Sequence, residues 1–317
     1  MVTIPALRVA FLGTPEFAVP TLQNLIDSRH DVVAVVSQPD RPKGRGHKEQ
    51  PTPTKVTAEA AGTVVLQPAR MKDEEFLRLL RSMSLDLGVV AAYGKILPDD
   101  LLAIPRLGMI NVHASLLPEY RGAAPVHRAV IDGRSETGVT IMRVVRELDA
   151  GPMFARVTRA IGPDETSVDV EHALARLGGD LLLEVVEQLA AGTASEEPQD
   201  HGRATYAHKL TKAEGTIDWT LPAARIHNMV RGLQPWPLVS VHLGDHRYLL
   251  HRTGKTGERS TATPGTIVDA SGDRLGVVAG DGEVLRILQL QPEGRRVMTA
   301  REFLAGRSVV AGHQFRP

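Results

Sequence analysis

Short apolar runs alternate with amphipathic segments through the first third of this 317-residue chain. The strand-like runs are at 7–13, 31–36, 63–66, 85–92 and 108–113, and the helix-like segments are at 17–29 and 73–83. Strands that alternate with helices predict an open, mostly parallel α/β sheet with a Rossmann-like layout. Ligands in such sheets bind at the carboxyl ends of the strands, so this edge is where we expect a site.

The rest of the chain predicts an extension of this sheet and a second domain. Two β-rich runs at 138–145 and 153–161 are expected to form a hairpin, and a long helix is expected over 166–191. A polar stretch with Gly and Pro follows and predicts a linker. Short β runs separated by turn residues then indicate a small β-barrel. The expected organisation is an α/β domain over 1–191, a linker over 192–207 and a barrel domain over 208–317.

Composition excludes several kinds of site and targeting. The chain has no cysteine, so disulfides, thiolate zinc sites and a cysteine nucleophile are excluded, and a reducing cytosol is the expected location. The N-terminus lacks a cationic segment followed by a long apolar one, and no apolar run is long enough to cross a bilayer. We therefore expect a cytoplasmic protein without a membrane partner.

The formal net charge of zero hides an asymmetry along the chain. Residues 206–317 carry 15 Lys and Arg against 10 Asp and Glu, whereas residues 1–205 carry 22 against 27. A basic module attached to an acidic one points to a polyanionic partner. An uneven distribution of solvated surface charge explains the same numbers, so charge alone leaves both interpretations open.

Three polar residues around the end of run 108–113 carry the most chemistry. Alternation along a strand puts Asn111 and His113 on the same face. If Asp149 reaches them, the set can stabilise an oxyanion through the amide and accept a proton from an attacking amine. Each residue alone has a plainer interpretation as a turn former or a partly buried side chain. Together they predict a catalytic trio for acyl transfer without a covalent enzyme intermediate.

Other catalytic and cofactor motifs are missing. Gly13 stands alone where a dinucleotide fingerprint needs three glycines, and no acidic residue follows the second strand, so NAD is not expected. The glycines and lysines of PKGRGHK at 42–48 lack Walker A spacing. No His, Asp or Glu cluster has convincing metal spacing, so no metal is expected. Ser115 lacks the G-x-S-x-G elbow of a hydrolase nucleophile.

Several long motifs, in order, resemble the folate-dependent formyltransferases. They are FLGTPEFAVPTL at 11–22, AAYGKILP at 91–98, NVHASLLPEYRGAAP at 111–125 and TGVTIMRVVRELDAGPM at 137–153. The resemblance implies formyl transfer from 10-formyltetrahydrofolate and assigns catalysis to Asn111, His113 and Asp149. It also implies that the C-terminal barrel is of the OB type.

The resemblance also implies where the folate lies. It places the donor between a loop and an opposite wall. The loop is formed by Ser115, Leu116, Leu117 and Pro118, and the wall by Tyr93, Gly94 and Ile96. As a backbone loop, the first segment offers amide and carbonyl groups and two leucines to a flat heterocycle. Ordinary core packing remains an open alternative for one of the two leucines.

Further motifs narrow the resemblance to the branch that acts on methionyl-initiator tRNA. They are SQPDRPKGRG at 37–46, TYAHKLTKAEGTIDW at 205–219 and QPWP at 234–237. The long polar segment 38–55 is expected as a loop whose cations contact phosphates and base edges. The implied tRNA contacts are Arg41, Lys43, Arg45, Lys48 and Lys209, with Arg45 as the leading one. A mobile solvated loop is the alternative for this segment.

Two other functions remain open at this point. A formyltransferase for a small amine, such as glycinamide ribonucleotide or an amino-sugar nucleotide, shares the motifs up to Asp149 but has little use for a basic C-terminal module. A non-catalytic RNA-binding protein would tolerate loss of the polar trio, whose three members are intact here. We expect a monomer that binds folate and methionyl-initiator tRNA.

Overall fold

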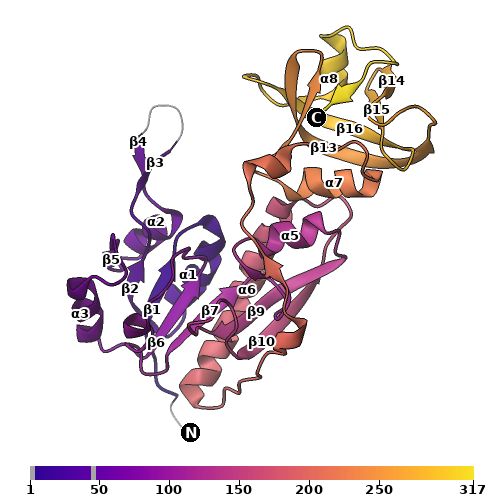
Figure 1. Ribbon diagram of the computed structural model, residues 1–317. Helices are drawn as coiled ribbons and strands as arrows, with labels where there is room; N and C mark the ends of the chain where they lie inside the picture. The colour runs from indigo at the N-terminus through magenta and orange to yellow at the C-terminus, as the bar shows by residue number, and fades with distance from the viewer. Residues whose placement is uncertain (1–3, 44–47) are drawn as a thin grey trace. The chain divides into compact units, whose positions relative to one another are not determined.

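The computed structural model describes residues 4–43 and 48–317, without the side chains of Lys43 and Lys48. The chain divides into two compact units (Figure 1). Unit 1 comprises 1–123, 137–159 and 171–207, and unit 2 comprises 124–136, 160–170 and 208–317. Two short segments that the sequence assigned to the first domain, 124–136 and 160–170, are thus grouped with unit 2.

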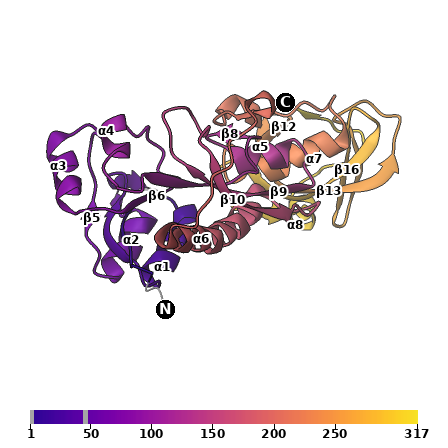
Figure 2. The ribbon, with the colours of Figure 1, turned by 90° about the horizontal axis from the view of Figure 1, so that it is seen from below.

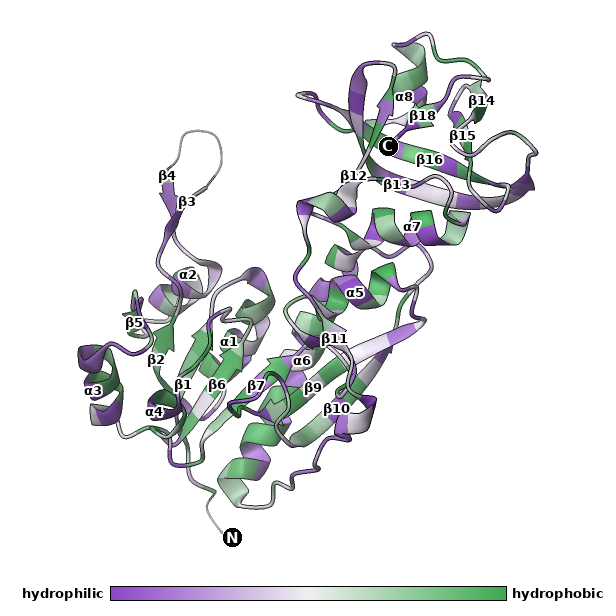
Figure 3. Ribbon diagram, in the orientation of Figure 1, coloured by the Kyte–Doolittle hydropathy of each residue, from purple (hydrophilic) through white to green (hydrophobic). Residues whose placement is uncertain are grey.

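A seven-stranded sheet organises unit 1. Its strands, in spatial order, are β10 (Met153–Ala160), β9 (Glu136–Arg143), β7 (Met109–His113), β6 (Leu87–Ala91), β1 (Arg8–Gly13), β2 (Asp31–Val36) and β5 (Val65–Leu66). The pairs from β7 to β5 are parallel, and β9 runs antiparallel to β7. The predicted open, mostly parallel Rossmann-like sheet is confirmed. Its inner strands β1 and β6 are largely hydrophobic along their length (Figure 3), as expected of strands covered on both faces.

Helices cover both faces of this sheet (Figure 2). On one face α3 (Glu74–Ser82) and α4 (Asp99–Leu102) bury Phe76, Leu80 and Leu101 in one apolar cluster with Leu12 and Val90 of the strands. On the other face α1 (Val19–Ile26) lies against α6 (Ser167–Ala191), where Asn24 Nδ2 donates to Asp180 Oδ1 at 2.9 Å. The helices therefore cover the faces of the sheet, and the strand ends are the places where a site can form.

The carboxyl ends of three strands meet at one edge of the sheet. Gly13 of β1 pairs with Ala91 of β6, and Ala91 pairs with Val112 of β7. His113 and the segment that begins at Ala92 therefore leave the sheet side by side. This arrangement places the predicted site residues of both segments at the same edge.

The segment 38–55 is more ordered than the predicted loop. Its described part contains the antiparallel pair β3 (Arg41–Lys43) and β4 (Lys48–Gln50), and α2 (Pro53–Ala60) begins before residue 55. Thr52 caps this helix by accepting a hydrogen bond from Lys55 N at 3.3 Å, and Pro53 occupies its first turn. A Thr cap followed by Pro is a standard helix start, so the expectation of a loop over all of 38–55 was wrong.

The segment 192–207, expected as a linker, is hydrogen-bonded into unit 1. Glu197 forms a β-bridge with Met153, and β11 (Tyr206–Ala207) pairs in parallel with β8 (Arg121–Gly122). Polar side chains of this segment have partners on the α/β sheet. The polar composition, from which the linker was predicted, does not show such contacts. One of these contacts, through Gln199, reaches the site described below.

Unit 2 contains the predicted small barrel. Its strands, in spatial order, are β14 (Ile267–Ser271), β15 (Arg274–Val278), β16 (Glu283–Pro292), β13 (His246–Arg259), β12 (Val239–Leu243) and β18 (Phe315–Arg316), with β17 (Met298–Thr299) beside β16. The curled sheet closes on itself, because Ile267 N donates to His313 O at 2.8 Å and Phe315 N donates to Gly265 O at 2.9 Å. The unit also contains the helices α5 (Pro125–Ile131), α7 (Ala223–Gly232) and α8 (Ala300–Ala305).

Aromatic side chains fill the interior of this barrel. Tyr248 meets the ring of Phe303 edge-on at a centroid distance of 5.3 Å, and Trp219 stacks on Phe315 at 6.3 Å. All four are buried. Aromatic residues are few in the chain, and these four lie together in a buried cluster. This cluster gives unit 2 a core of its own.

Candidate active site

Strand β7 presents Asn111 and His113 on one face, as the sequence predicts. Asn111 lies opposite Met142 and His113 lies opposite Thr140 in the neighbouring antiparallel strand β9. Paired residues share a face of a sheet, so all four side chains point to the same side. The two polar side chains of β7 therefore project over a floor formed partly by β9.

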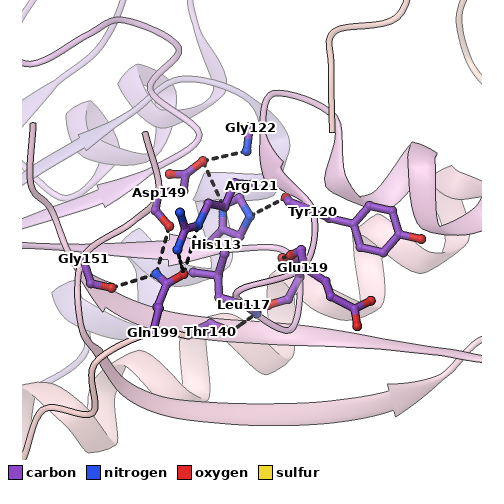
Figure 4. Close-up of polar contacts among 11 residues, drawn as sticks. His113, Leu117, Glu119, Tyr120, Arg121, Gly122, Thr140, Asp149, Gly151 and Gln199 are labelled. Atoms are coloured by element: carbon purple, nitrogen blue, oxygen red, sulfur yellow. Dashed lines mark hydrogen bonds and ion pairs between the residues drawn. The ribbon is translucent and has the colours of Figure 1, made fainter. Parts of the chain in front are cut away.

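Two contacts fix the imidazole of His113 (Figure 4). Its Nε2 lies 3.0 Å from the carbonyl oxygen of Tyr120, and its Nδ1 lies 3.7 Å from Asp149 Oδ2. A carbonyl oxygen only accepts hydrogen bonds, so Nε2 carries a proton. Nδ1 then keeps a lone pair that can accept a hydrogen bond or a proton, and the Asp149 carboxylate faces it. The ring is 5% exposed, so the Asp149 carboxylate faces it in a poorly hydrated place.

Asp149 reaches the strand end from the turn between β9 and β10. Its Oδ2 accepts a hydrogen bond from Gly122 N at 2.8 Å, and the same oxygen faces His113. Its backbone is left-handed, with φ of 46°. This conformation is unfavourable for most residues, and Asp adopts it more readily than most. The fold therefore brings together the three predicted catalytic residues Asn111, His113 and Asp149 at one strand end.

Asn111 differs from His113 and Asp149 in its side-chain contacts. Within residues 4–43 and 48–317 its amide forms no hydrogen bond, although the residue is half-buried. An amide that is partly removed from water and has no hydrogen-bond partner in the protein can donate to an oxygen of a ligand. It therefore has the capacity to stabilise negative charge on a carbonyl oxygen held beside His113.

The loop at 115–118 is attached to the sheet by Thr140. The Thr140 hydroxyl donates to Ser115 O at 2.7 Å and accepts from Leu117 N at 3.1 Å. The Ser115 hydroxyl donates a hydrogen bond to Glu119 O at 2.6 Å, so it is not presented as a nucleophile. The loop is therefore fixed mainly through its backbone, next to the His113 end of β7.

The two leucines of this loop have different environments. Leu117 is 1% exposed and packs with Met142 and Met153, whereas Leu116 is half-buried. Of the open alternatives, core packing thus applies to Leu117. Pro118 is also buried. Leu116 remains the leucine of the loop that a ligand can touch.

We expect Thr140→Val to lower the free energy of unfolding by about 1–3 kcal/mol, because a buried N–H and a buried carbonyl lose their partner. Thermal or urea unfolding measures this change. Thr21→Val is the matched control: Thr21 is equally buried, and its hydroxyl has no hydrogen-bond partner among the described residues. Equal losses in both variants would show that Thr140 does not anchor the loop.

The opposite wall predicted at 93–96 is divided between core and surface. Tyr93 is buried, its hydroxyl lies 3.0 Å from Met71 Sδ, and burial raises its pKa to about 12. Its carbonyl accepts from Gln38 Nε2 at 2.8 Å. Gly94 is exposed with φ of 77°, and Ile96 is 91% exposed. An aliphatic side chain so exposed beside strand ends can cover a flat apolar ligand, so Gly94 and Ile96 remain the accessible part of the wall.

The predicted tRNA contacts are described only in part. Arg41 is exposed, and its Nη2 donates to Gln38 Oε1 at 3.2 Å. Arg45 and the side chains of Lys43 and Lys48 lie outside the described residues. Lys209 is exposed in unit 2.

Several residues of the site were not predicted. Tyr120 and Gly122 contribute a backbone carbonyl and a backbone amide, and the sequence analysis assigned neither of them to the site. Arg121 and Thr140 stand inside the quoted motifs, and a buried arginine there could have been noticed. Gln199 comes from the presumed linker and had no signal of its own.

Within the described part of the chain, no group of three or more His, Asp or Glu side chains is arranged to hold a metal ion. Among the same residues, no helix is both long enough and apolar enough to cross a membrane.

Family models match both parts of the chain. Residues 7–186 match the formyl transferase model, and residues 209–308 match the model of the formyl transferase C-terminal domain. A protein of Heliobacterium modesticaldum named methionyl-tRNA formyltransferase is 44% identical, over 98% of this chain and 100% of that protein. One of Geobacter metallireducens with the same name is 45% identical, over 95% and 96%.

This chain belongs to the methionyl-tRNA formyltransferase family. The resemblance seen in the sequence motifs is thereby confirmed. Two solved structures share its fold. An N-formyltransferase of Helicobacter canadensis, in complex with folinic acid and dTDP-3-aminofucose, gives a TM-score of 0.68 at 16% identity, over 90% of this chain and 99% of that one. HypX of Aquifex aeolicus, in complex with tetrahydrofolic acid, gives 0.64 at 14% identity, over 98% and 51%.

Proposed function

We propose that this member of the methionyl-tRNA formyltransferase family transfers the formyl group of 10-formyltetrahydrofolate to the α-amino group of methionyl-initiator tRNA. The observation that carries the proposal is the meeting of Asn111, His113 and Asp149 at the end of β7. The named relatives support the acceptor, and the family supports a folate-type donor.

The trio supplies what direct acyl transfer needs. The amine nitrogen attacks the formyl carbon, and the carbonyl oxygen gains negative charge that the Asn111 amide stabilises. The nitrogen gives up a proton, which His113 accepts on Nδ1 while the facing Asp149 carboxylate stabilises the cationic ring. The bond between the formyl carbon and N10 of the folate then breaks, and the proton passes to N10. No covalent bond to the protein forms.

The residues around the trio fit a folate-type donor. The backbone of the loop fixed by Thr140 offers polar groups, and Leu116, Gly94 and Ile96 offer accessible surface. A few polar groups among apolar side chains are typical of small-molecule sites. We propose that Leu117, Pro118 and Tyr93 support this surface from within the core.

The acceptor is tested by offering three amines to the unmodified protein with 10-formyltetrahydrofolate. They are charged initiator tRNA, charged elongator tRNA and glycinamide ribonucleotide. We expect formylation of the initiator tRNA only, measured as formylmethionine released from the tRNA. Transfer to the small amine with none to tRNA would support the alternative reaction and overturn this proposal.

For the tRNA contact, we expect Arg45→Ala to weaken binding of initiator tRNA and to reduce the slope of log Kd against log salt by about one, because one phosphate contact is lost. Fluorescence or filter binding at several salt concentrations measures both. Arg78→Ala on the exposed side of α3 is the control, since it removes an arginine outside the proposed contact set. An unchanged slope in Arg45→Ala would remove this residue from the interface.

A further inference from the structure

The backbone of Asp149 contacts a buried glutamine, which is itself hydrogen-bonded to a buried arginine. Gln199 and Arg121 are 5% and 4% exposed. The Arg121 guanidinium donates from Nε and Nη2 to Gln199 Oε1 at 3.0 and 2.6 Å. Gln199 Nε2 in turn donates to Asp149 O at 2.9 Å and to Gly151 O at 2.7 Å. Three segments far apart in sequence thus meet at one amide group (Figure 4).

The chemistry of the two side chains fixes the orientation of the amide. An arginine only donates hydrogen bonds, so the oxygen of Gln199 must face Arg121. The NH₂ group must then face the two carbonyls, and both of its protons are used. The fork of the guanidinium also polarises the amide, which strengthens its donation to the carbonyls. The pair therefore acts as a clamp on the backbone at 149 and 151.

The clamped turn has a conformation that needs support. Asp149 is left-handed, with φ of 46°. Two residues on, a Cβ added to Gly151 would lie 2.0 Å from Arg143 O, so the turn is pressed against the preceding strand. The direction of the Asp149 carboxylate depends on this backbone. The Cβ atom is bonded to Cα, so a rotation of φ moves the carboxylate that Cβ carries. A small rotation would move Oδ2 away from His113 and from Gly122 N.

We propose that Gln199, held by Arg121, is a positioning residue that keeps the Asp149 carboxylate directed at His113. Its kinetic consequence rests on the proposed function, whereas its structural consequence does not. If the pair only fastened segment 192–207 to unit 1, its loss would lower stability without a specific loss of catalysis.

The kinetic test replaces Gln199 by Met, which keeps the volume and removes both donors. We expect kcat to fall by about 10- to 100-fold, as for a displaced catalytic group, with KM unchanged for the folate and for the tRNA. Gln234→Met is the matched control, because Gln234 Nε2 also donates to two backbone carbonyls, Val230 O at 3.2 Å and His251 O at 2.6 Å, but in unit 2. The control should keep its kcat. Equal loss in both variants would overturn the proposal.

A double-mutant cycle separates action through Asp149 from a general effect. If Gln199 acts by holding Asp149, then Gln199→Met costs little more once Asp149→Asn has been introduced. If the cost is the same in both backgrounds, Gln199 does not act through Asp149. Should Gln199→Met not fold, Gln199→Glu serves in its place, because it keeps the bond to Arg121 and the volume but turns the donor toward the carbonyls into an acceptor.

A turnover-independent measurement completes the test. The Gly122 amide donates to the Asp149 carboxylate, so its hydrogen exchange, followed by NMR, should become faster in Gln199→Met and stay slow in Gln234→Met. The neighbouring amides of Arg121 and Ala123 bond to Thr205 O and Ala207 O at 2.9 Å and should stay protected. Unchanged exchange at Gly122 would overturn the positioning role. If the unmodified protein transferred no formyl group, the proposed function would fall, and this result would still decide the role of Gln199.

Discussion

His113→Ala is expected to lower kcat for formyl transfer by about 10²- to 10⁴-fold, the usual contribution of a positioned general base. In the proposed mechanism the Nδ1 atom that faces Asp149 accepts the proton, and alanine offers no replacement. Binding of either substrate is expected to change little, because the loss is made in the transition state. Steady-state kinetics with both substrates varied separates kcat from KM.

A matched control distinguishes lost chemistry from lost packing. His30 is buried to the same 5% in unit 1, and its Nδ1 accepts a hydrogen bond from Leu7 N at 3.1 Å. His30→Ala should therefore lose stability as His113→Ala does, since each vacates a buried site and one hydrogen bond, yet keep its kcat. A kcat near that of the unmodified protein in His113→Ala would remove the imidazole from the proton transfer.

Asn111→Ala is expected to lower kcat by about 10²- to 10³-fold, the cost of one missing donor to an oxyanion. Stability should not fall, because the Asn111 amide has no hydrogen bond within the described part of the chain. Removing a polar group that is half-buried and unpaired can even raise the melting temperature. Calorimetry and kinetics on the same preparation measure the two effects.

Asn24 provides the reverse case. Its amide donates to Asp180 Oδ1 at 2.9 Å and joins α1 to α6. Asn24→Ala should lower stability slightly and leave kcat unchanged. If Asn111→Ala instead lost stability and kept its activity, Asn111 would be a structural residue and the oxyanion would need another donor.

The sheet could be predicted because its strands are apolar on both faces. The runs that become β1, β6 and β7 are nearly uninterrupted, and the helices between them show one apolar face. The trio could be predicted because Asn111 and His113 are two residues apart on a strand, and motif order supplied Asp149. Which residues are buried was harder to predict. The sequence does not distinguish Leu116 from Leu117, because their burial depends on which of them packs against Met142 and Met153.

Long-range polar contacts were the part that could not be predicted. Gln199 lies 50 residues from Asp149 and 78 from Arg121, in a stretch whose composition is typical of a linker. Its contacts depend on how the segment after α6 returns across the sheet, which no local pattern determines. Similarly, Tyr120 and Gly122 act through backbone atoms, and the sequence does not show which side chains those atoms meet.

Single-turnover transfer with saturating protein tests the central claim most directly, because it reports the chemical step without product release. Labelled 10-formyltetrahydrofolate and charged initiator tRNA are mixed with the unmodified protein, Asn111→Ala or His113→Ala, and formylmethionyl-tRNA is counted over time. We predict rapid transfer by the unmodified protein and a rate lower by about 10²-fold or more in both variants with both substrates still bound. Transfer by either variant at the unmodified rate, or none by the unmodified protein, would contradict the claim that these residues at the end of β7 perform the reaction.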